Sequence, residues 1–172
     1  MSLILLMGMI GILLVLFLKR PIIDTIAKDN KIVYKFQNAN WFQNHWLSGL
    51  FLFGLNAVLF FSTVLILYLF MFLFIPFVHF FVMLLAVMIS IYVWIIIHKS
   101  WKGTKRNRLK LGAVGSSFYL FLTMMFVFWL VTLTPSYPGD DTFMGAVGLV
   151  FAMIVTSMAF VTCMVITGFS KA

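Results

Sequence analysis

The stretch that decides the fold runs from Leu47 to Ile97 and reads LSGLFLFGLNAVLFFSTVLILYLFMFLFIPFVHFFVMLLAVMISIYVWIII. It contains no Asp, Glu, Lys or Arg. As one helix it would be about 76 Å long, which is more than twice the ~30 Å hydrocarbon core of a bilayer. The chain must therefore fold back, and Pro76 is the expected break because proline removes a backbone N–H and clashes with the preceding turn. The stretch predicts two membrane spans, about residues 47–73 and 77–98.

The composition of the whole chain supports the same reading. Of its 172 residues, 64% are hydrophobic and 9% are charged, whereas a soluble domain carries about 25% charged residues. Two further apolar stretches, 111–134 and 143–169, predict two more spans. We therefore expect an all-α fold, a polytopic transmembrane helical bundle that forms a single integral membrane domain over residues 1–172.

The first apolar segment, residues 2–18, is uncharged and is followed by Lys19 and Arg20. It has no basic residues before it and no small-residue cleavage site after it, so we expect a retained span rather than a signal peptide. This gives five spans, about 2–18, 47–73, 77–98, 111–134 and 143–169. Residues 2–18 would form a helix only about 25 Å long. The alternative is four spans, with this segment lying in the membrane interface.

The charges predict an orientation. With five spans, all 12 Lys and Arg residues fall in the loops 19–46 and 99–110 or in the C-terminal tail, whereas the loop 135–142 holds only Asp140 and Asp141. Basic loops stay in the cytoplasm. We therefore predict cytoplasmic loops 19–46 and 99–110, an outside N-terminus and a cytoplasmic C-terminus, in the plasma membrane of a prokaryote. Four tryptophans, which favour the membrane–water interface, cluster on the same side: Trp41, Trp46, Trp94 and Trp101.

Residues 22–36 carry apolar side chains at roughly helical spacing with charged residues between them. This pattern indicates a short amphipathic helix on the cytoplasmic surface. A turn at Asp29-Asn30 is an equal alternative.

The last span has a face of small residues along its whole length. Small side chains let helix backbones approach closely in a membrane. We expect this face to pack against other helices of the bundle; the alternative is a docking face for another subunit. Its members recur every three or four residues: Gly145, Gly148, Ala152, Thr156, Ala159, Cys163 and Thr167.

Polar residues within the other spans form a possible polar seam. An unpaired amide in hydrocarbon is costly, so Asn56 is expected to face protein or water. Hydrogen bonds between helices are the favoured interpretation, and a solute path is the alternative. The seam comprises Asn56, Thr63, His79, Ser90, Ser116 and Thr123.

The basic loop is expected to hold anionic lipid headgroups, at about 1 kcal/mol per basic residue near the surface, or to bind an acidic protein partner. We do not expect it to bind nucleic acid. The residues concerned are Lys99, Lys102, Lys105, Arg106, Arg108 and Lys110.

Few residues are suited to catalysis. The chain has no Glu, no Asp, Lys or Arg lies within a predicted span, and a single Cys163 allows no intramolecular disulfide. His45 and His98 lie at matching depth and could in principle ligate haem, although histidines at span ends more often reach lipid headgroups. We predict no catalytic residue, no metal site and no cofactor.

The leading hypothesis is a non-catalytic integral membrane subunit that scaffolds or regulates a larger complex, such as a transporter, a secretion system or a membrane enzyme. Its partners would be other membrane subunits, or further copies of itself, and anionic lipid. The alternative is a small transporter or oligomeric channel for a neutral or lipid-like solute. A membrane enzyme or haem protein using His45 and His98 is a third hypothesis.

Overall fold

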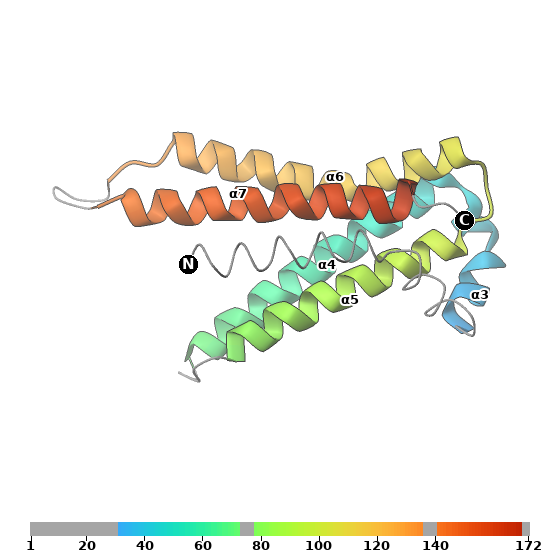
Figure 1. The fold of residues 1–172 in the computed structure, drawn as a ribbon, viewed down its shortest axis with the longest axis horizontal. Helices are drawn as coiled ribbons and strands as arrows, with labels where there is room; N and C mark the ends of the chain where they lie inside the picture. The colour runs from blue at the N-terminus through green and yellow to red at the C-terminus, as the bar shows by residue number, and fades with distance from the viewer. Residues whose placement is uncertain (1–30, 73–77, 136–140, 170–172) are drawn as a thin grey trace.

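The computed structural model describes residues 31–72, 78–135 and 141–169, and this part of the chain is all-α (Figure 1). Its short elements are the helix α3 (Lys31–Gln37) and the 3₁₀ turn η1 (Asn40–Gln43). Its long helices are α4 (His45–Phe72), α5 (Val78–Ser100), α6 (Lys105–Val131) and α7 (Phe143–Met164), the last continuing as the π-helical turn η2 (Val165–Phe169).

Four helices in the described residues are long and apolar enough to cross a membrane: α4, α5, α6, and α7 together with η2. The chain is therefore a multi-pass membrane protein. The last of these spans covers the predicted 143–169, and α4 and α5 begin and end within two residues of the predicted bounds. The first predicted span, residues 2–18, and the expected break at Pro76 lie outside the described residues.

The start of α6 differs from the prediction. The helix begins at Lys105, so that most of the predicted loop 99–110 is helical and only residues 101–104 join α5 to α6. Thr104 caps the helix, since its Oγ1 accepts a hydrogen bond from the Asn107 N–H at 3.4 Å. Lys and Arg are good helix formers whose long side chains reach water from the first turn. A prediction from hydropathy alone therefore places the start of this helix too late in the sequence.

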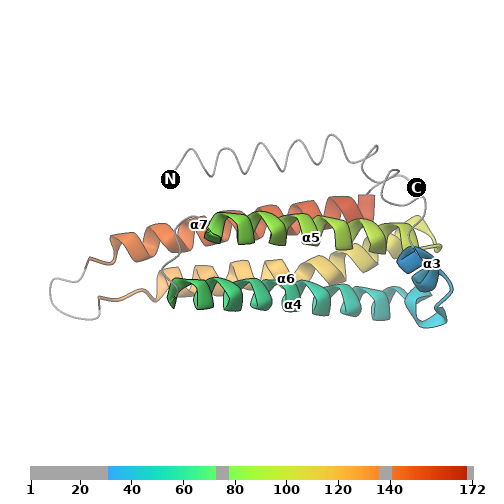
Figure 2. The same cartoon turned by 90° about the horizontal axis from the view of Figure 1, so that it is seen from below.

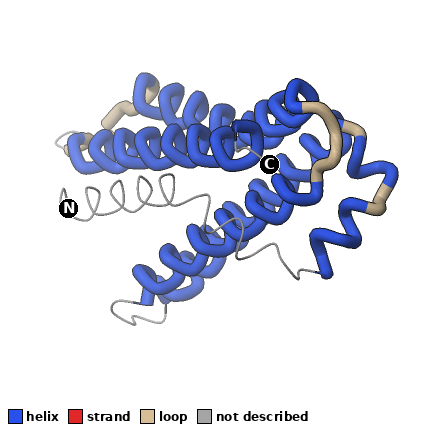
Figure 3. Tube along the Cα trace, turned by 45° about the vertical axis from the view of Figure 1, so that its right-hand side comes forward, coloured by secondary structure: helices blue, strands red, loops and turns tan. Residues whose placement is uncertain are grey.

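The long helices form two hairpins, α4 with α5 and α6 with α7. Helix α6 is central, because it packs extensively against both α4 and α7, whereas α5 contacts the second hairpin through η2. The hairpins meet at the end of the bundle that carries α3, η1 and residues 101–104, and they diverge toward the other end (Figures 1 and 3). We call these the basic end and the opposite end.

Side chains are also more deeply buried at the basic end than toward the opposite end. Leu122 and Trp129 lie seven residues apart on one face of α6, yet Leu122 is 3% exposed and Trp129 is 51% exposed. The hydrophobic core therefore lies at the basic end, where all four long helices contribute. Its most completely buried apolar side chains are Phe42, Leu52, Ile97, Leu111 and Ile166.

The segment before α4 closes the basic end. Helix α3 covers the last part of the predicted amphipathic helix 22–36, while residues 22–30 lie outside the described residues. It buries Val33 and exposes Lys31 and Lys35, as an amphipathic surface helix should. The Phe36 ring packs 5.0 Å from Phe42. These contacts fix the surface helix on the core.

Candidate functional site

A buried polar junction joins the two hairpins at Asn56. Its Oδ1 accepts a hydrogen bond from Trp94 Nε1 at 2.9 Å, and its Nδ2 donates to the Gly115 carbonyl at 3.0 Å. The same Nδ2 lies 3.8 Å from Cys163 Sγ. One side chain of α4 thus contacts α5, α6 and α7. The Trp94 ring is further held edge-on against Tyr119, with centroids 6.1 Å apart. The amide is buried and satisfied, so it serves as a fixed contact between helices.

Glycines let α4 and α6 approach closely beside Asn56. A Cβ built on Gly115 would lie 2.3 Å from Leu52 Cδ2, and one on Gly49 would lie 2.8 Å from Val114 Cβ. The small-residue contact was predicted on α7, and Gly115 was not predicted to take part in one. The sequence does contain a pattern that indicates this contact. Gly112 and Gly115 are three residues apart in an apolar helix, which places both on one helix face.

The small-residue face of α7 packs within the chain over its basic-end part. Thr156, Cys163 and Thr167 are buried, and the Thr123 Oγ1 of α6 donates to Thr156 Oγ1 at 2.8 Å. Ala152 and Ala159 are half-buried. Toward the opposite end the face opens, and its two outermost members, Gly145 and Gly148, are exposed.

The polar seam residues do not form one continuous contact. Thr63 and Ser90 donate to carbonyls of their own helices, at 2.7 Å to Leu59 and 2.8 Å to Ala86. The remaining members divide among separate contacts: Asn56 in the buried junction, Thr123 with Thr156, Ser116 with the Ala113 carbonyl and Met164, and the exposed His79 beside Phe80. A solute path stays a prediction.

The histidines at the basic end have different neighbours. His98 is buried, and its Nδ1 lies 3.3 Å from the Thr167 carbonyl. His45 is half-buried, with its ring 5.7 Å from that of Trp46. Among residues 31–72, 78–135 and 141–169, no group of three or more His, Cys, Asp or Glu side chains is placed to hold a metal ion.

The loop between α5 and α6 is held in place by two glutamines. Gln37 Nε2 donates to the Lys99 carbonyl at 3.0 Å. Gln43 Nε2 donates to the Ser100 carbonyl at 3.3 Å, and Gln43 Oε1 accepts from the Lys102 N–H at 3.2 Å. These bonds tie the last turn of α5 and the loop that follows it to α3 and η1.

Tryptophan packing also fixes this loop. The Trp101 ring is buried beneath it, and a Cβ built on Gly103 would lie 2.6 Å from Trp101 Cζ2. Of the four tryptophans predicted at the interface, Trp94 and Trp101 are buried, whereas Trp41 and Trp46 are exposed. Two of the four therefore pack in the core rather than against lipid headgroups.

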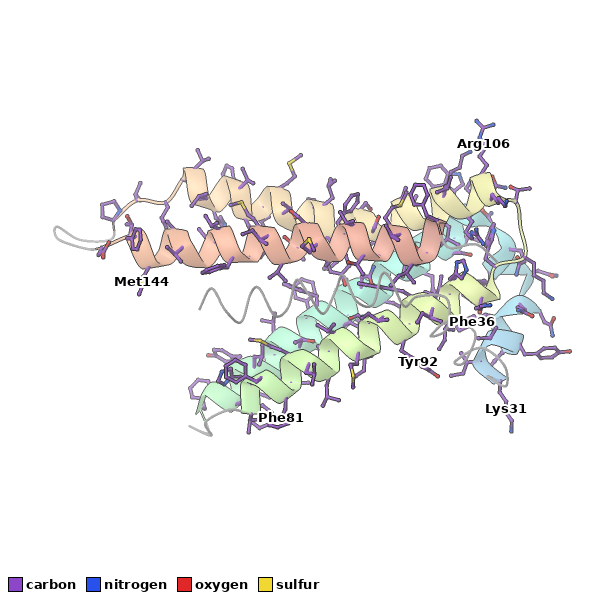
Figure 4. The ribbon with its side chains drawn as sticks, viewed as in Figure 1. Lys31, Phe36, Phe81, Tyr92, Arg106 and Met144 are labelled. Atoms are coloured by element: carbon purple, nitrogen blue, oxygen red, sulfur yellow. The ribbon has the colours of Figure 1, made fainter. Side chains whose placement is uncertain are left out.

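The cationic side chains of this region form a basic shelf, defined as Lys99, Lys102, Lys105, Arg106, Arg108 and Lys110. Arg108 is buried and Lys99 is half-buried, whereas the other four are exposed. Figure 4 shows Arg106 pointing away from the helices. Every described Lys and Arg lies at the basic end, and the one described acidic residue, Asp141, lies at the opposite end beside the start of α7.

The described residues thus offer a satisfied packing junction and a fixed display of positive charge. Comparison with protein-family models, with curated proteins and with solved structures found no match to the chain.

Proposed function

We propose that the protein is a non-catalytic integral membrane subunit that scaffolds or regulates a larger membrane complex, such as a transporter, a secretion system or a membrane enzyme. The observation that supports this proposal is the basic shelf. Of its four exposed cations, Lys102 stands on the loop 101–104 and the other three stand on the first two turns of α6. Gln37, Gln43 and Trp101 hold the end of α5 and this loop in one geometry.

A fixed display of charge favours a protein partner. Lipid headgroups are mobile, and a flexible polybasic segment is enough to attract them. A shaped acidic surface on a partner gains more from cations that are already positioned, because less conformational freedom is lost on binding. Complementary charge then speeds the encounter and selects the partner. The shelf would bind an acidic surface of another subunit, with anionic lipid around it.

The proposed orientation follows the positive-inside rule. The basic shelf faces the cytoplasm, and the opposite end with Asp141 faces outside. Residues 2–18 form a fifth span, which places the N-terminus outside and the C-terminus in the cytoplasm. The partner surface is therefore cytoplasmic.

Purification of the tagged chain in mild detergent tests this proposal. We expect a second membrane subunit to co-purify at a constant ratio to the chain. The variant Lys102→Glu/Arg106→Glu should reduce that ratio about tenfold, because it places negative charge on the shelf. The matched control Lys31→Glu/Lys35→Glu makes the same change in net charge on α3, at the same end of the bundle, and should retain the partner.

Two outcomes would overturn the proposal. One is a monodisperse chain that purifies without any partner at low ionic strength. The other is a partner that both variants retain equally, since its binding would then not use the shelf. Circular dichroism of both variants would establish that they keep the wild-type helix content.

A further inference from the structure

One face of α6 is uncovered from the first turn of the helix to the last. Figure 2 shows α4 and α6 in one layer of the bundle and α5 and α7 in the other. Helix α6 packs against α4 and α7 with the side that buries Leu111, Phe118 and Leu122. On the other side, Met124 is 64% exposed and Val131 is 79% exposed. We call this side the outer face of α6, and it runs through Arg106, Lys110, Ala113, Ser117, Met124 and Val131.

The outer face of α6 carries exposed cations at its basic end. Arg106 and Lys110 lie one turn apart there, and Arg106 points away from the helices (Figure 4). The unpaired N–H groups of the first turn add a partial positive charge. Within the bounds of α4, α5, α7 and η2 the only Lys or Arg is Lys99, which is half-buried. Among the described long helices, α6 alone therefore joins an exposed apolar face to exposed cations.

Next to these cations the side chains of the outer face are small. Ala113 is exposed and Ser117, one turn further along, is half-buried. Ser117 Oγ donates to the Val114 carbonyl of its own helix at 2.6 Å, so its hydroxyl needs no other partner. Small residues let the backbone of another helix approach closely in a membrane. A helix that packs here would bring its end within reach of the Arg106 and Lys110 side chains.

The outer face is also long enough for a complete span. From Arg106 to Val131 it measures about 38 Å at 1.5 Å per residue, which exceeds the ~30 Å hydrocarbon core. A helix that crosses the membrane beside α6 can therefore contact it at every depth. Its end beside Arg106 would lie at the cytoplasmic surface in the proposed orientation.

Charge restricts which helix can pack there. Most spans carry Lys or Arg at the cytoplasmic end, and such residues would be repelled by Arg106 and Lys110. A second copy of the chain would meet the same repulsion, because two-fold association through this face sets each cation against its counterpart. An anionic lipid offsets the charge, but acyl chains gain nothing from close approach of backbones. A span with Asp or Glu at its cytoplasmic end suits both the cations and the small residues.

We infer that the outer face of α6 binds a transmembrane helix of the partner subunit, and that this helix carries Asp or Glu at its cytoplasmic end. The inference rests on the proposed function. It names the element of the partner that makes contact and the helix of this chain that receives it, which the basic shelf alone does not. The closest approach is at Ala113 and Ser117, with the carboxylates of the partner beside Arg106 and Lys110.

Photo-cross-linking in the native membrane tests this contact. The photoreactive amino acid p-benzoylphenylalanine replaces Ala113, Met124 or Val131 in turn. We expect each position to give an adduct with the same membrane protein. Mass spectrometry should place the linked peptides in one apolar stretch of about 20 residues, with Asp or Glu at the end that links to position 113. The matched controls are Phe61 of α4 and Leu85 of α5, which are 62% and 53% exposed, and they should give about tenfold less adduct.

A change of bulk tests the close approach without altering charge. Ala113→Phe fills the smallest part of the outer face and should reduce the co-purified partner about tenfold. Ser157→Phe is the matched control, since it places the same large side chain at an exposed position of α7, and it should retain the partner. Circular dichroism would establish that both variants keep the wild-type helix content.

Four results would overturn the inference. They are adducts with a second copy of the chain, adducts with another segment of the same chain, adducts with lipid alone, and equal yields from α4, α5 and α6. A partner that depends on the basic shelf but does not cross-link to α6 would overturn this inference and leave the proposed function standing. The absence of any co-purifying partner would overturn both.

Discussion

At the scale of single residues, Asn56 links the two hairpins by contacts with three other helices. It is the only amide within the predicted spans, and the sequence required that it face protein or water. The structure shows protein neighbours on three other helices. A hydrogen bond has a narrow range of geometry, so this residue fixes one register where apolar contacts alone would allow several.

Asn56→Ala should lower the free energy of unfolding by about 1–2 kcal/mol, because the buried Trp94 N–H loses its acceptor and the helices lose a bridge. Thr63→Ala, one heptad along the same helix, is the control. The Thr63 hydroxyl bonds to the Leu59 carbonyl of its own helix, so its loss should change stability by less than about 0.5 kcal/mol. Denaturation in detergent, followed by circular dichroism, measures both; equal losses would contradict a bridging role.

At the scale of helices, α6 organises the bundle, because it packs against α7 of its own hairpin and against α4 of the other hairpin. It achieves this with glycines toward α4 and with Thr123 toward Thr156 of α7. In lipid, no hydrophobic effect drives helices together. Close approach of the backbones and hydrogen bonds between helices therefore hold the bundle together.

Gly115→Ala should therefore weaken the contact between α4 and α6. The new methyl would lie within 2.8 Å of Leu52 Cβ, an atom that cannot move without its helix. We expect a loss of about 1–3 kcal/mol, as for other overpacked cores. Gly54→Ala is the control, since a Cβ there meets no described atom within 4 Å and alanine favours a helix over glycine. It should be neutral or slightly stabilising in the same assay; a loss as large as that of Gly115→Ala would argue against the close contact.

The helices were easier to predict than their contacts. Hydrophobic length alone located α7, because a span needs an uninterrupted apolar run. For α4 and α5, which come from one such run, the break expected at Pro76 was also needed. Packing partners could not be read in the same way, since residues that face lipid and residues that face protein are equally apolar. Leu122 is buried in α6 whereas Leu120, two positions earlier, is exposed, and nothing in the residue type distinguishes them. Asn56 carried more information, because a buried amide requires hydrogen-bond partners. Glycine carried less, since Gly115 is buried against Leu52 whereas Gly148 is exposed.

At the scale of the molecule, the two ends of the bundle differ in charge. Described basic residues gather around α3 and the start of α6, and Asp141 stands at the other end, where its carboxylate accepts the Phe143 N–H at 2.9 Å. Basic segments are retained in the cytoplasm during insertion, while acidic residues contribute little to orientation. This asymmetry supports one orientation of the bundle in the membrane, with the basic end inside.

Labelling with a membrane-impermeant maleimide in intact cells would test that orientation. In a Cys163→Ser background, Thr134→Cys reports on the opposite end and Asn38→Cys on the basic end; both sites are exposed and neither change alters the charge. We expect Thr134→Cys to be labelled in intact cells, and Asn38→Cys only after the membrane is permeabilised, with a difference of about tenfold.

A third variant, Ser2→Cys, decides between five spans and four. If residues 2–18 cross the membrane, Ser2→Cys should be labelled in intact cells together with Thr134→Cys. If the segment lies in the interface, Ser2→Cys should follow Asn38→Cys and need permeabilisation. Wild-type protein provides the baseline, because its only cysteine, Cys163, is buried. The reversed pattern at Thr134 and Asn38 would place the basic end outside, and the basic shelf could then not bind a cytoplasmic partner.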